Sequence, residues 1–329
     1  MKIIAPISEL KEAEMLLHFG ADELYCGVCT PEWQSHFGSR LWMNRRDPLQ
    51  ANISSWQEIQ KLADLAHINN ARVHLTLNAP FYPRGSTAYL LKLCKKLVSE
   101  IGVDGLIVSD LNMLILLAKE KLPVRIHLSS LGSCFNAEAV DFYLSLGVKR
   151  IILPRQLKLS EIKRLIGKAD SEMEFEVFAL NDGCFFEEGF CQTSHTFGPF
   201  CLGEWKMSAI TSEDSDISTK EIENRFANFR EYLWFQNNCG SSFQDEGLPN
   251  GPCSLCQFGH FRDWGVKAVK IVGREASFYR KMRSLQLVKA VMDNVRNGQS
   301  PEAVAEHARA LRGTPDLCEK GYMCYFRDN

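Results

Sequence analysis

The sequence has no uninterrupted apolar stretch of the roughly 18 residues that a membrane-spanning helix requires. Its opening segment, Met1–Pro6, resembles a strand and carries no charged leader before an apolar run, so we expect no signal peptide. The formal net charge is only −2, which excludes a bulk attraction to nucleic acid or anionic membranes but leaves a local basic groove open. These absences predict a cytoplasmic protein without a membrane span.

Several catalytic motifs are also missing. The loop after the first expected strand reads Pro6-Ile7-Ser8 instead of GxGxxG, which argues against a dinucleotide-binding sheet. There is no HExxH, no GxSxG and no evident Cys–His nucleophile pair, so the motifs give no support to peptidase chemistry. A cysteine and a histidine distant in the sequence could still meet in space, so a peptidase stays open as an alternative.

What the sequence does contain is a repeated alternation of short β-branched runs and amphipathic segments. The expected strands are Lys2–Ile7, Glu23–Gly27, Arg72–Asn78, Gly105–Ser109, Arg125–Ser129, Arg150–Pro154, Glu174–Leu180 and Ala268–Val272. The expected helices are Ser8–Phe19, Ser54–Asn69, Thr87–Ile101, Leu111–Lys121, Ala137–Leu146, Leu159–Ile166 and Ala276–Asn297. A glycine turn repeatedly ends a helix before the next strand, as at Gly102 and Gly147.

This alternation predicts an α/β protein with a parallel sheet, and eight units favour a closed (βα)8 TIM-like barrel over an open doubly wound sheet. We expect the barrel over residues 1–297, with a long Cys-rich insertion at 181–252 after the seventh strand, and a C-terminal helical tail over residues 298–329. The insertion and a second long loop, Cys29–Asn52, both follow the carboxyl ends of strands. Barrel enzymes keep their active sites on that face.

The cysteines gather around the insertion. The sequence has twelve, and the set in this region is Cys184, Cys191, Cys201, Cys239, Cys253 and Cys256. Thiolates in a reducing compartment suit an iron–sulfur cluster or zinc, although zinc usually takes two close pairs and only Cys253/Cys256 is one here. Scattered structural cysteines are the remaining alternative. A second CxxC, Cys26/Cys29, fits either a redox pair or ligand, or half core and half loop.

Polar residues near the strand ends are candidates for catalysis. His127 could move a proton near neutral pH, although it could equally be a satisfied interior histidine. Arg155, or else Arg40 or Arg274, could hold the carboxylates of a small anion. Lys270 lies in an apolar strand, so it must be paired or lie at the barrel mouth.

The order of several motifs resembles peptidase family U32. Glu176-Val177-Phe178 precedes Cys184-x4-Gly189-x-Cys191 and Ser194, which is similar to the family's cysteine signature, with Thr193 at a position that is aliphatic in the family. Lys270-Ile271-Val272-Gly273-Arg274 resembles its Lys-Ile-Glu-Gly-Arg, with Val272 in place of the acid. The resemblance covers about residues 1 to 297.

The resemblance implies a [4Fe–4S] cluster held by four cysteines. Carried over, Cys184 and Cys191 match the first two ligands, Cys201 is the expected third and Cys253 the expected fourth, with Cys239 and Cys256 in reserve. Relatives take part in oxygen-independent hydroxylation of a ubiquinone precursor or of RNA, with prephenate implicated as a small anionic oxygen donor, and a homologous U32 partner subunit is possible. The loss of the acid at Val272 puts equivalent substrate chemistry in question.

Three functions follow from these patterns. The first is an iron–sulfur hydroxylase that works without O2 on RNA or an aromatic acceptor. The second is a non-catalytic subunit, stabilised by zinc or a cluster, of a hydroxylase complex. The third is a U32-type peptidase. The small net charge argues against a large RNA footprint.

Overall fold

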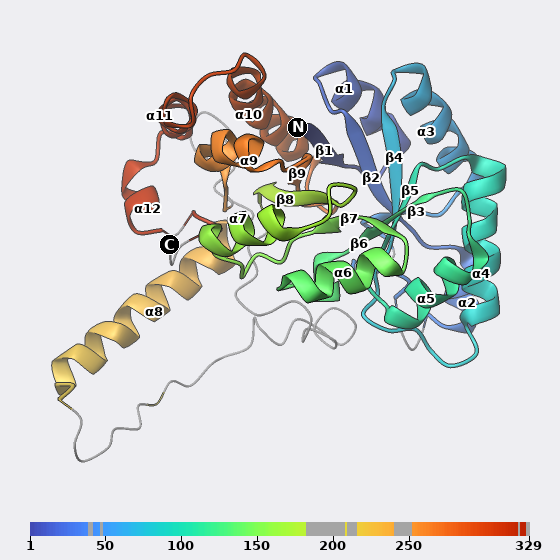
Figure 1. Ribbon diagram of the computed structural model, residues 1–329, viewed down its shortest axis with the longest axis horizontal. Coiled ribbons are helices and arrows are strands. Elements are labelled where there is room, and N and C mark those ends of the chain that lie inside the picture. The colour runs from blue at the N-terminus through green and yellow to red at the C-terminus, as the bar shows by residue number, and fades with distance from the viewer. Residues whose placement is uncertain are drawn as a thin grey trace.

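The computed structural model describes residues 1–38, 42–46, 49–181, 208, 216–239, 252–321 and 323–326. Eight parallel strands close into a barrel with helices around it (Figure 1). The barrel strands are β1 (Lys2–Pro6), β2 (Glu23–Val28), β4 (Arg72–Leu77), β5 (Gly105–Val108), β6 (Arg125–Leu128), β7 (Val148–Ile152), β8 (Glu174–Leu180) and β9 (Ala268–Ile271). Pairing of β1 with both β2 and β9 closes the ring, so the predicted TIM-like barrel is confirmed and the open sheet is excluded.

Helices follow most of the strands and cover the outside of the barrel (Figure 1). They are α1 (Ala13–His18), α3 (Trp56–Ile68), α4 (Thr87–Lys95), α5 (Leu111–Glu120), α6 (Ala137–Ser145), α7 (Leu159–Lys168), α9 (Phe258–Trp264) and α10 (Phe278–Arg296). The C-terminal tail adds α11 (Pro301–Arg312), which packs against α9 and α10, and α12 (Pro315–Glu319). Side-chain caps fix where several begin: Asp110 accepts from the Met113 amide and Asn136 from the Ala139 amide. Gly102 ends its helix with φ +81°, as the glycine-turn pattern predicted.

The structure adds elements that the sequence pattern did not predict. In the loop after β2, Thr30 caps the short helix α2 (Pro31–His36), and β3 (Asn52–Ile53) pairs with β2. Within the insertion, α8 (Thr219–Cys239) is a long helix whose described side chains are mostly exposed. Two short helical turns, η3 (Ser130–Gly132) and η6 (Leu255–Gln257), are also new. The turn η1 (Leu10–Glu12) and the π-helical segment η2 (Lys96–Ile101), which continues α4, lie within helices that the sequence predicted.

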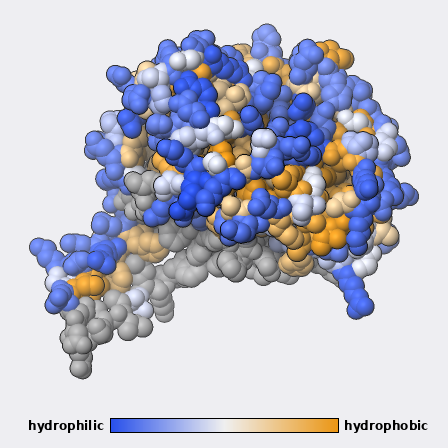
Figure 2. All heavy atoms as spheres, in the orientation of Figure 1, coloured by the Kyte–Doolittle hydropathy of each residue, from blue (hydrophilic) through white to orange (hydrophobic). Residues whose placement is uncertain are grey.

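The barrel separates two apolar regions. The larger core lies between the strands and the surrounding helices, and a smaller cluster lies inside the barrel, made of Ile4, Tyr25, Ile107, Ile152, Phe178, Ala268 and Val272. Outside, apolar side chains appear as patches among hydrophilic ones, as Figure 2 shows for one face. No helix in the described part of the chain is long and apolar enough to cross a bilayer.

The two ends of the insertion are joined at the barrel rim. The Asn181 amide donates to the Pro252 carbonyl over 2.8 Å, and Leu180 and Cys253 form an antiparallel bridge. The Ser254 hydroxyl donates to the Phe178 carbonyl over 2.6 Å. The insertion therefore leaves and re-enters the barrel at one point, beside the carboxyl end of β8.

Candidate functional site

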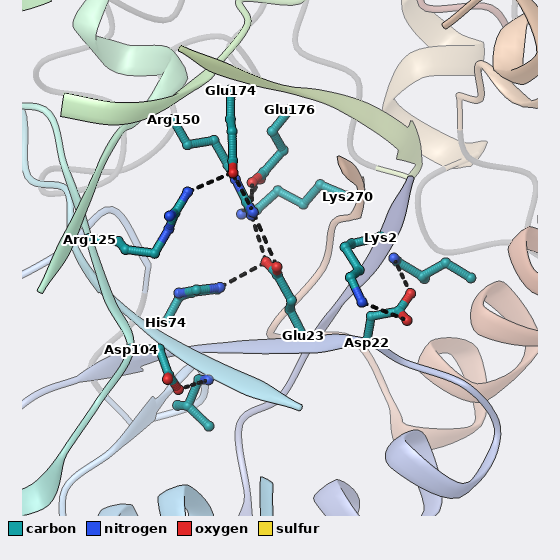
Figure 3. Close-up of polar contacts among 12 residues, drawn as sticks. Lys2, Asp22, Glu23, His74, Asp104, Arg125, Arg150, Glu174, Glu176 and Lys270 are labelled. Carbon is teal, nitrogen blue, oxygen red and sulfur yellow. Dashed lines mark hydrogen bonds and ion pairs between the residues drawn. The ribbon is translucent and has the colours of Figure 1, made fainter. Parts of the chain in front are cut away.

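A charged cluster fills one part of the barrel interior, around the Arg150 side chain of β7 (Figure 3). Arg150 donates to both carboxylate oxygens of Glu23, from Nη1 over 2.6 Å and from Nη2 over 3.1 Å. The same carboxylate receives His74 Nε2 at 2.8 Å. All three side chains are almost completely buried, so this bidentate pair is a strong, specific contact in a region of low dielectric.

The cluster continues across β8 and β9. Arg150 also reaches Glu174 at 3.0 Å and Glu176 at 3.4 Å, and Glu176 binds Lys270 Nζ at 2.8 Å. Lys270 Nζ lies 3.9 Å from the centre of the Tyr25 ring. The expectation that Lys270 is either paired or at the mouth is thus resolved as a buried ion pair.

The electrostatics of the cluster hold the Glu23 carboxylate ionised. Burial alone would raise the pKa of Glu23, but the hydrogen bonds and charges of His74 and Arg150 outweigh it and hold that pKa well below its ordinary value. Burial lowers the pKa of Lys270, and the Glu176 carboxylate opposes that shift. Glu23 and Glu174 open their strands, at the amino-terminal end of the barrel, which lies opposite the face where barrel enzymes keep their active sites. We interpret the cluster as structural.

His127 of β6 lies inside the barrel against this cluster, with its ring centre 4.5 Å from that of His74. Its side chain is fully buried, and neither ring nitrogen has a hydrogen-bond partner among the residues that the structure describes. Burial lowers its pKa well below the ordinary value, and the charges of His74 and Arg150 add to this effect. His127 therefore lies in the barrel interior, as one of the two alternatives predicted, but the described residues do not satisfy the hydrogen-bonding capacity of its ring.

This environment makes stability depend on pH. The unfolded His127 takes up a proton near pH 6.5 and the folded one only at lower pH, so the unfolded state binds more protons between the two pKa values. We expect the free energy of unfolding to fall as pH drops below about 6.5, by up to about 1.4 kcal/mol per pH unit from this group. Urea titrations from pH 7.5 to 5 measure how the free energy of unfolding changes with pH. His127→Leu should reduce this pH dependence. The control His36→Gln, at an exposed histidine, should leave it unchanged. An unchanged slope in His127→Leu contradicts the prediction.

At the carboxyl ends of the strands, the barrel mouth holds Arg274, just beyond β9. Its guanidinium donates to the Thr76 hydroxyl at 2.7 Å, to Asn44 Oδ1 at 3.0 Å and to the Ala51 carbonyl at 3.4 Å. The side chain is only 4% exposed, and burial lowers its pKa to about 10. Among the described residues no carboxylate forms a salt bridge with it, so this buried cation is bound by neutral acceptors.

The surroundings of Arg274 are built for this contact. A Cβ on Gly27 would overlap the guanidinium and the Asn52 side chain, so only glycine leaves the space. Asn44 also hydrogen-bonds to Asn52, and Arg46 pairs with Glu275 at 3.3 Å. Polar contacts therefore fix the described residues 44–46 and 51–52 of the loop after β2 at the barrel mouth.

Arg155 follows β7 at the same end of the barrel. It is partly buried, and its guanidinium carbon lies 3.6 Å from the centre of the Phe178 ring. Nearby, Asn78 donates to the Ser129 hydroxyl at 3.3 Å. The structure thus separates the predicted catalytic residues: Arg155 lies near the mouth, whereas His127 and Lys270 lie inside the barrel. Arg40 falls outside the described residues.

Cys253 is the one predicted cluster ligand among the described residues, because Cys184, Cys191 and Cys201 lie outside them. It is buried, and it lines a cavity of about 160 Å3 together with Cys256 and two tail cysteines, Cys318 and Cys324. In the described part of the chain, no three His, Cys, Asp or Glu side chains are already arranged to hold a metal ion.

The other CxxC pair belongs to the core. Cys26 and Cys29 both pack in the main hydrophobic cluster. Burial raises the pKa of Cys26 to about 12, so its thiol stays protonated at neutral pH. The core interpretation fits these observations better than a redox pair.

Sequence reasoning named Glu176 only as part of a motif and did not detect its partners Glu23 and Arg150. The sequence did contain a signal for this pair: Glu23 and Arg150 are ionisable residues in otherwise mostly apolar strands, and such residues must find partners when they lie inside a barrel. The tail cysteines were also unplaced, since no local pattern relates Cys318 to Cys253.

The chain resembles proteins named for RNA hydroxylation. The tRNA hydroxylation protein P of Escherichia coli K12 is 29% identical over 332 residues, covering 91% of this chain and 69% of that protein. The Helicobacter pylori J99 protein of the same name is 28% identical over 194 residues, covering 59% of this chain and 42% of its own length. The E. coli 23S rRNA 5-hydroxycytidine C2501 synthase is 26% identical over 198 residues, covering 59% of this chain and 26% of that protein.

This chain spans less than half the length of the H. pylori relative. A solved structure, the U32 peptidase Mk0906, aligns with a TM-score of 0.44 at 15% identity, covering 60% of this chain and 78% of that one. The family described as Peptidase family U32 matches residues 8–329, almost the whole sequence. The chain therefore belongs to peptidase family U32.

Proposed function

We propose that this protein catalyses or supports an oxygen-independent hydroxylation in the cytoplasm, with RNA as the acceptor and a small organic anion such as prephenate as the oxygen donor. The names of the relatives support RNA over a quinone precursor, although each name describes only that protein. The observation that carries the donor part of the proposal is Arg274, a buried cation at the barrel mouth bound only by neutral groups among the described residues.

Arg274 suits a carboxylate ligand for two physical reasons. A buried guanidinium without a negative partner is costly, and an anion would offset that cost. Its planar array of donors can also hold a carboxylate through two hydrogen bonds. Arg155, stacked on Phe178 near the same end of the barrel, is a second candidate clamp. The two arginines would bind and orient the donor, while the loop over the mouth would limit access of water.

The proposal includes a [4Fe–4S] cluster held by cysteines of the insertion, namely Cys184, Cys191 and Cys201, with a fourth ligand from Cys253 or the reserves. The donor chemistry of the described part is compatible with such a group, because the joined insertion ends carry a buried thiol, Cys253, and Cys184 follows Leu180 by four positions. When bound, the cluster would supply one-electron chemistry. His127 and Lys270 would act by positioning the strands beneath the mouth, because both are enclosed in the barrel.

The metal content of the protein tests the cluster. Anaerobically purified protein should contain iron and acid-labile sulfide, with a broad visible absorption that Cys184→Ala and Cys191→Ala remove. Cys134→Ala, at a buried thiol distant in sequence from the insertion, is the matched control and should keep both. Absence of iron and sulfide from the wild-type protein would refute the cluster.

Substrate assays test the reaction. The protein, with any partner subunit required, should hydroxylate RNA without O2 only when the anionic donor is supplied. If the protein hydroxylates a quinone precursor but not RNA, the acceptor is the quinone precursor and the RNA part of the proposal is wrong. Protease activity that survives metal loss but disappears with one Cys→Ala change would favour a peptidase. If the isolated chain binds the cluster but is inactive until a partner is added, it is a supporting subunit.

A further inference from the structure

The C-terminal tail of the chain returns to the barrel rim, beside the two ends of the insertion. The Cys253 amide donates to the Met323 carbonyl over 2.7 Å, and the Tyr325 amide donates to the Cys253 carbonyl over 3.3 Å. Cys253 in turn pairs with Leu180, the last residue of β8. The backbone of residues 323–326 is therefore held at the carboxyl end of β8, on the side of the barrel mouth.

The Tyr325 side chain reaches into this mouth. Its hydroxyl donates to the carbonyl of Asn181, the residue that directly follows β8. Its ring centre lies 6.1 Å from that of Phe178, and the ring packs against the apolar cluster inside the barrel. A residue of the tail thus covers part of the barrel interior from the side where barrel enzymes keep their active sites.

Asn181, to which the Tyr325 hydroxyl binds, is a fixed point of the rim. Its φ is +69°, in the left-handed region that residues other than glycine adopt only when their surroundings hold them there. Its amide donates to the Pro252 carbonyl, and its side chain donates to Ser284 over 2.8 Å and accepts from Arg280 over 3.3 Å. The Tyr325 ring is therefore attached to a rigid part of the barrel.

The same ring contacts Arg155, which follows β7. The guanidinium carbon lies 3.6 Å from the centre of the Phe178 ring and 6.0 Å from that of Tyr325. A cation within about 6 Å of a ring centre is attracted to the face of the ring. The three side chains line a cavity of about 10 Å3, close to the smallest space that holds one water molecule, so they pack tightly.

This contact prepares the guanidinium for a ligand. An arginine side chain has many rotamers, and a ligand must pay for the freedom that the side chain loses on binding. Two rings that already restrict Arg155 reduce this loss, which is the benefit of a pre-organised site. The rings occupy faces of the guanidinium plane, and the N–H groups at its edge are the ones that hold a carboxylate.

We propose that Tyr325 is a positioning residue of the donor site. Its ring, together with Phe178, holds Arg155 ready for a carboxylate of the donor, and its hydroxyl fixes the ring to the rim through Asn181. This inference rests on the proposed function, because it takes Arg155 as a clamp for the donor. It adds the C-terminal tail to the site that the barrel mouth forms.

Binding of prephenate to the full-length protein tests the role of Tyr325. Anaerobic calorimetric titration gives the affinity and the fraction of protein that binds, and it needs neither RNA nor turnover. Tyr325→Leu should weaken binding by roughly 2- to 30-fold, the loss expected from one cation–π contact. Tyr325→Phe keeps the ring and should lose much less. Met323→Leu, a change of similar volume at a buried side chain of the same segment, should bind as the wild type does.

A double-mutant cycle tests whether Tyr325 acts through Arg155. Arg155→Met should itself weaken prephenate binding, and adding Tyr325→Leu to it should weaken binding little further, because the side chain that Tyr325 positions is gone. A merely structural role would lower the free energy of unfolding and the fraction of protein that binds, with the affinity of the folded fraction unchanged. Tyr325→Met, which lacks the ring but has a similar reach, replaces Tyr325→Leu if that variant folds poorly.

Several outcomes would overturn the inference. If the wild type binds prephenate and Tyr325→Leu binds it equally well, Tyr325 is not a positioning residue and the donor site itself stands. If the losses of Arg155→Met and Tyr325→Leu add in the double variant, Tyr325 does not act through Arg155. If the wild type does not bind prephenate at all, the donor part of the proposed function fails together with this inference.

Discussion

Replacing Arg150 by methionine should destabilise the protein by roughly 3–5 kcal/mol, the range expected when one partner of a buried ion pair is removed. Arg150 is 2% exposed and binds both oxygens of Glu23. The substitution therefore leaves that carboxylate buried, with His74 as its remaining hydrogen-bond partner among the described residues. A loss of this size is a large part of the 5–15 kcal/mol that stabilises a typical domain. Urea unfolding at neutral pH measures it.

Arg125→Met is the matched control. Arg125 pairs with Glu174 at 2.8 Å, but its side chain is about one third exposed. Solvent screening limits such a pair to about 1 kcal/mol or less. The double variant Glu23→Gln/Arg150→Met should recover part of the free energy of unfolding that Arg150→Met loses, because it no longer contains an unpaired buried carboxylate. If Arg150→Met is no more destabilising than Arg125→Met, the cluster does not stabilise the barrel.

The same cluster sets a response to acid. The pKa of Glu23 is lowered in the folded state, so its contribution to stability is present above the unfolded value of about 4.3 and is lost as pH falls below it. Arg150→Met removes one cause of that lowering. The difference in stability between wild type and Arg150→Met should therefore shrink as the pH is lowered from 5 toward 3.

The barrel could be predicted from the sequence because its signals are local. The strands are short and mostly apolar runs, several helices end at glycine turns, and all eight expected strands lie within two residues of the observed ones. The helix α8 was missed because it lies inside an insertion with no strand rhythm, although Ile222, Phe226 and Phe229 recur in it at helical spacing.

The candidate site was predicted less completely, because its contacts depend on register. The sequence placed Arg274 and Arg155 near strand ends, but it could not show that Gly27 leaves space for the Arg274 guanidinium or that Thr76 accepts from it. His127 illustrates the same limit: the alternatives of catalytic and interior histidine differ only in which barrel layer the side chain occupies. Pairings between distant segments, such as Cys253 with Cys324, appear only in the fold.

Arg274→Met should strongly weaken binding of the anionic donor while leaving the fold intact. Loss of hydrogen bonds to a charged ligand is worth about 1.5–3 kcal/mol, so donor affinity should fall by roughly 10- to 150-fold or more. Arg274→Lys keeps the charge but loses the two-pronged geometry, and its loss should be smaller. The affinity for RNA should change little. Donor titrations and the donor KM measure these effects.

Stability distinguishes a ligand-binding role for Arg274 from a structural one. Arg274 has no salt bridge among the described residues, so its removal takes away the cost of burying a charge. The groups that accept from it keep other hydrogen bonds. Asn44 Oδ1 still accepts from the Arg46 amide, and the Thr76 hydroxyl still donates to the Cys26 carbonyl. The free energy of unfolding of Arg274→Met should therefore stay level or rise as donor binding is lost. Arg46→Met removes a neighbouring positive charge that Glu275 already pairs, and it should bind the donor normally. A residue that is kept at the expense of stability is expected where a ligand supplies the missing partner, and that is the role we expect for Arg274. If Arg274→Met instead unfolds more easily and still binds the donor, this arginine supports the loop and does not bind the ligand.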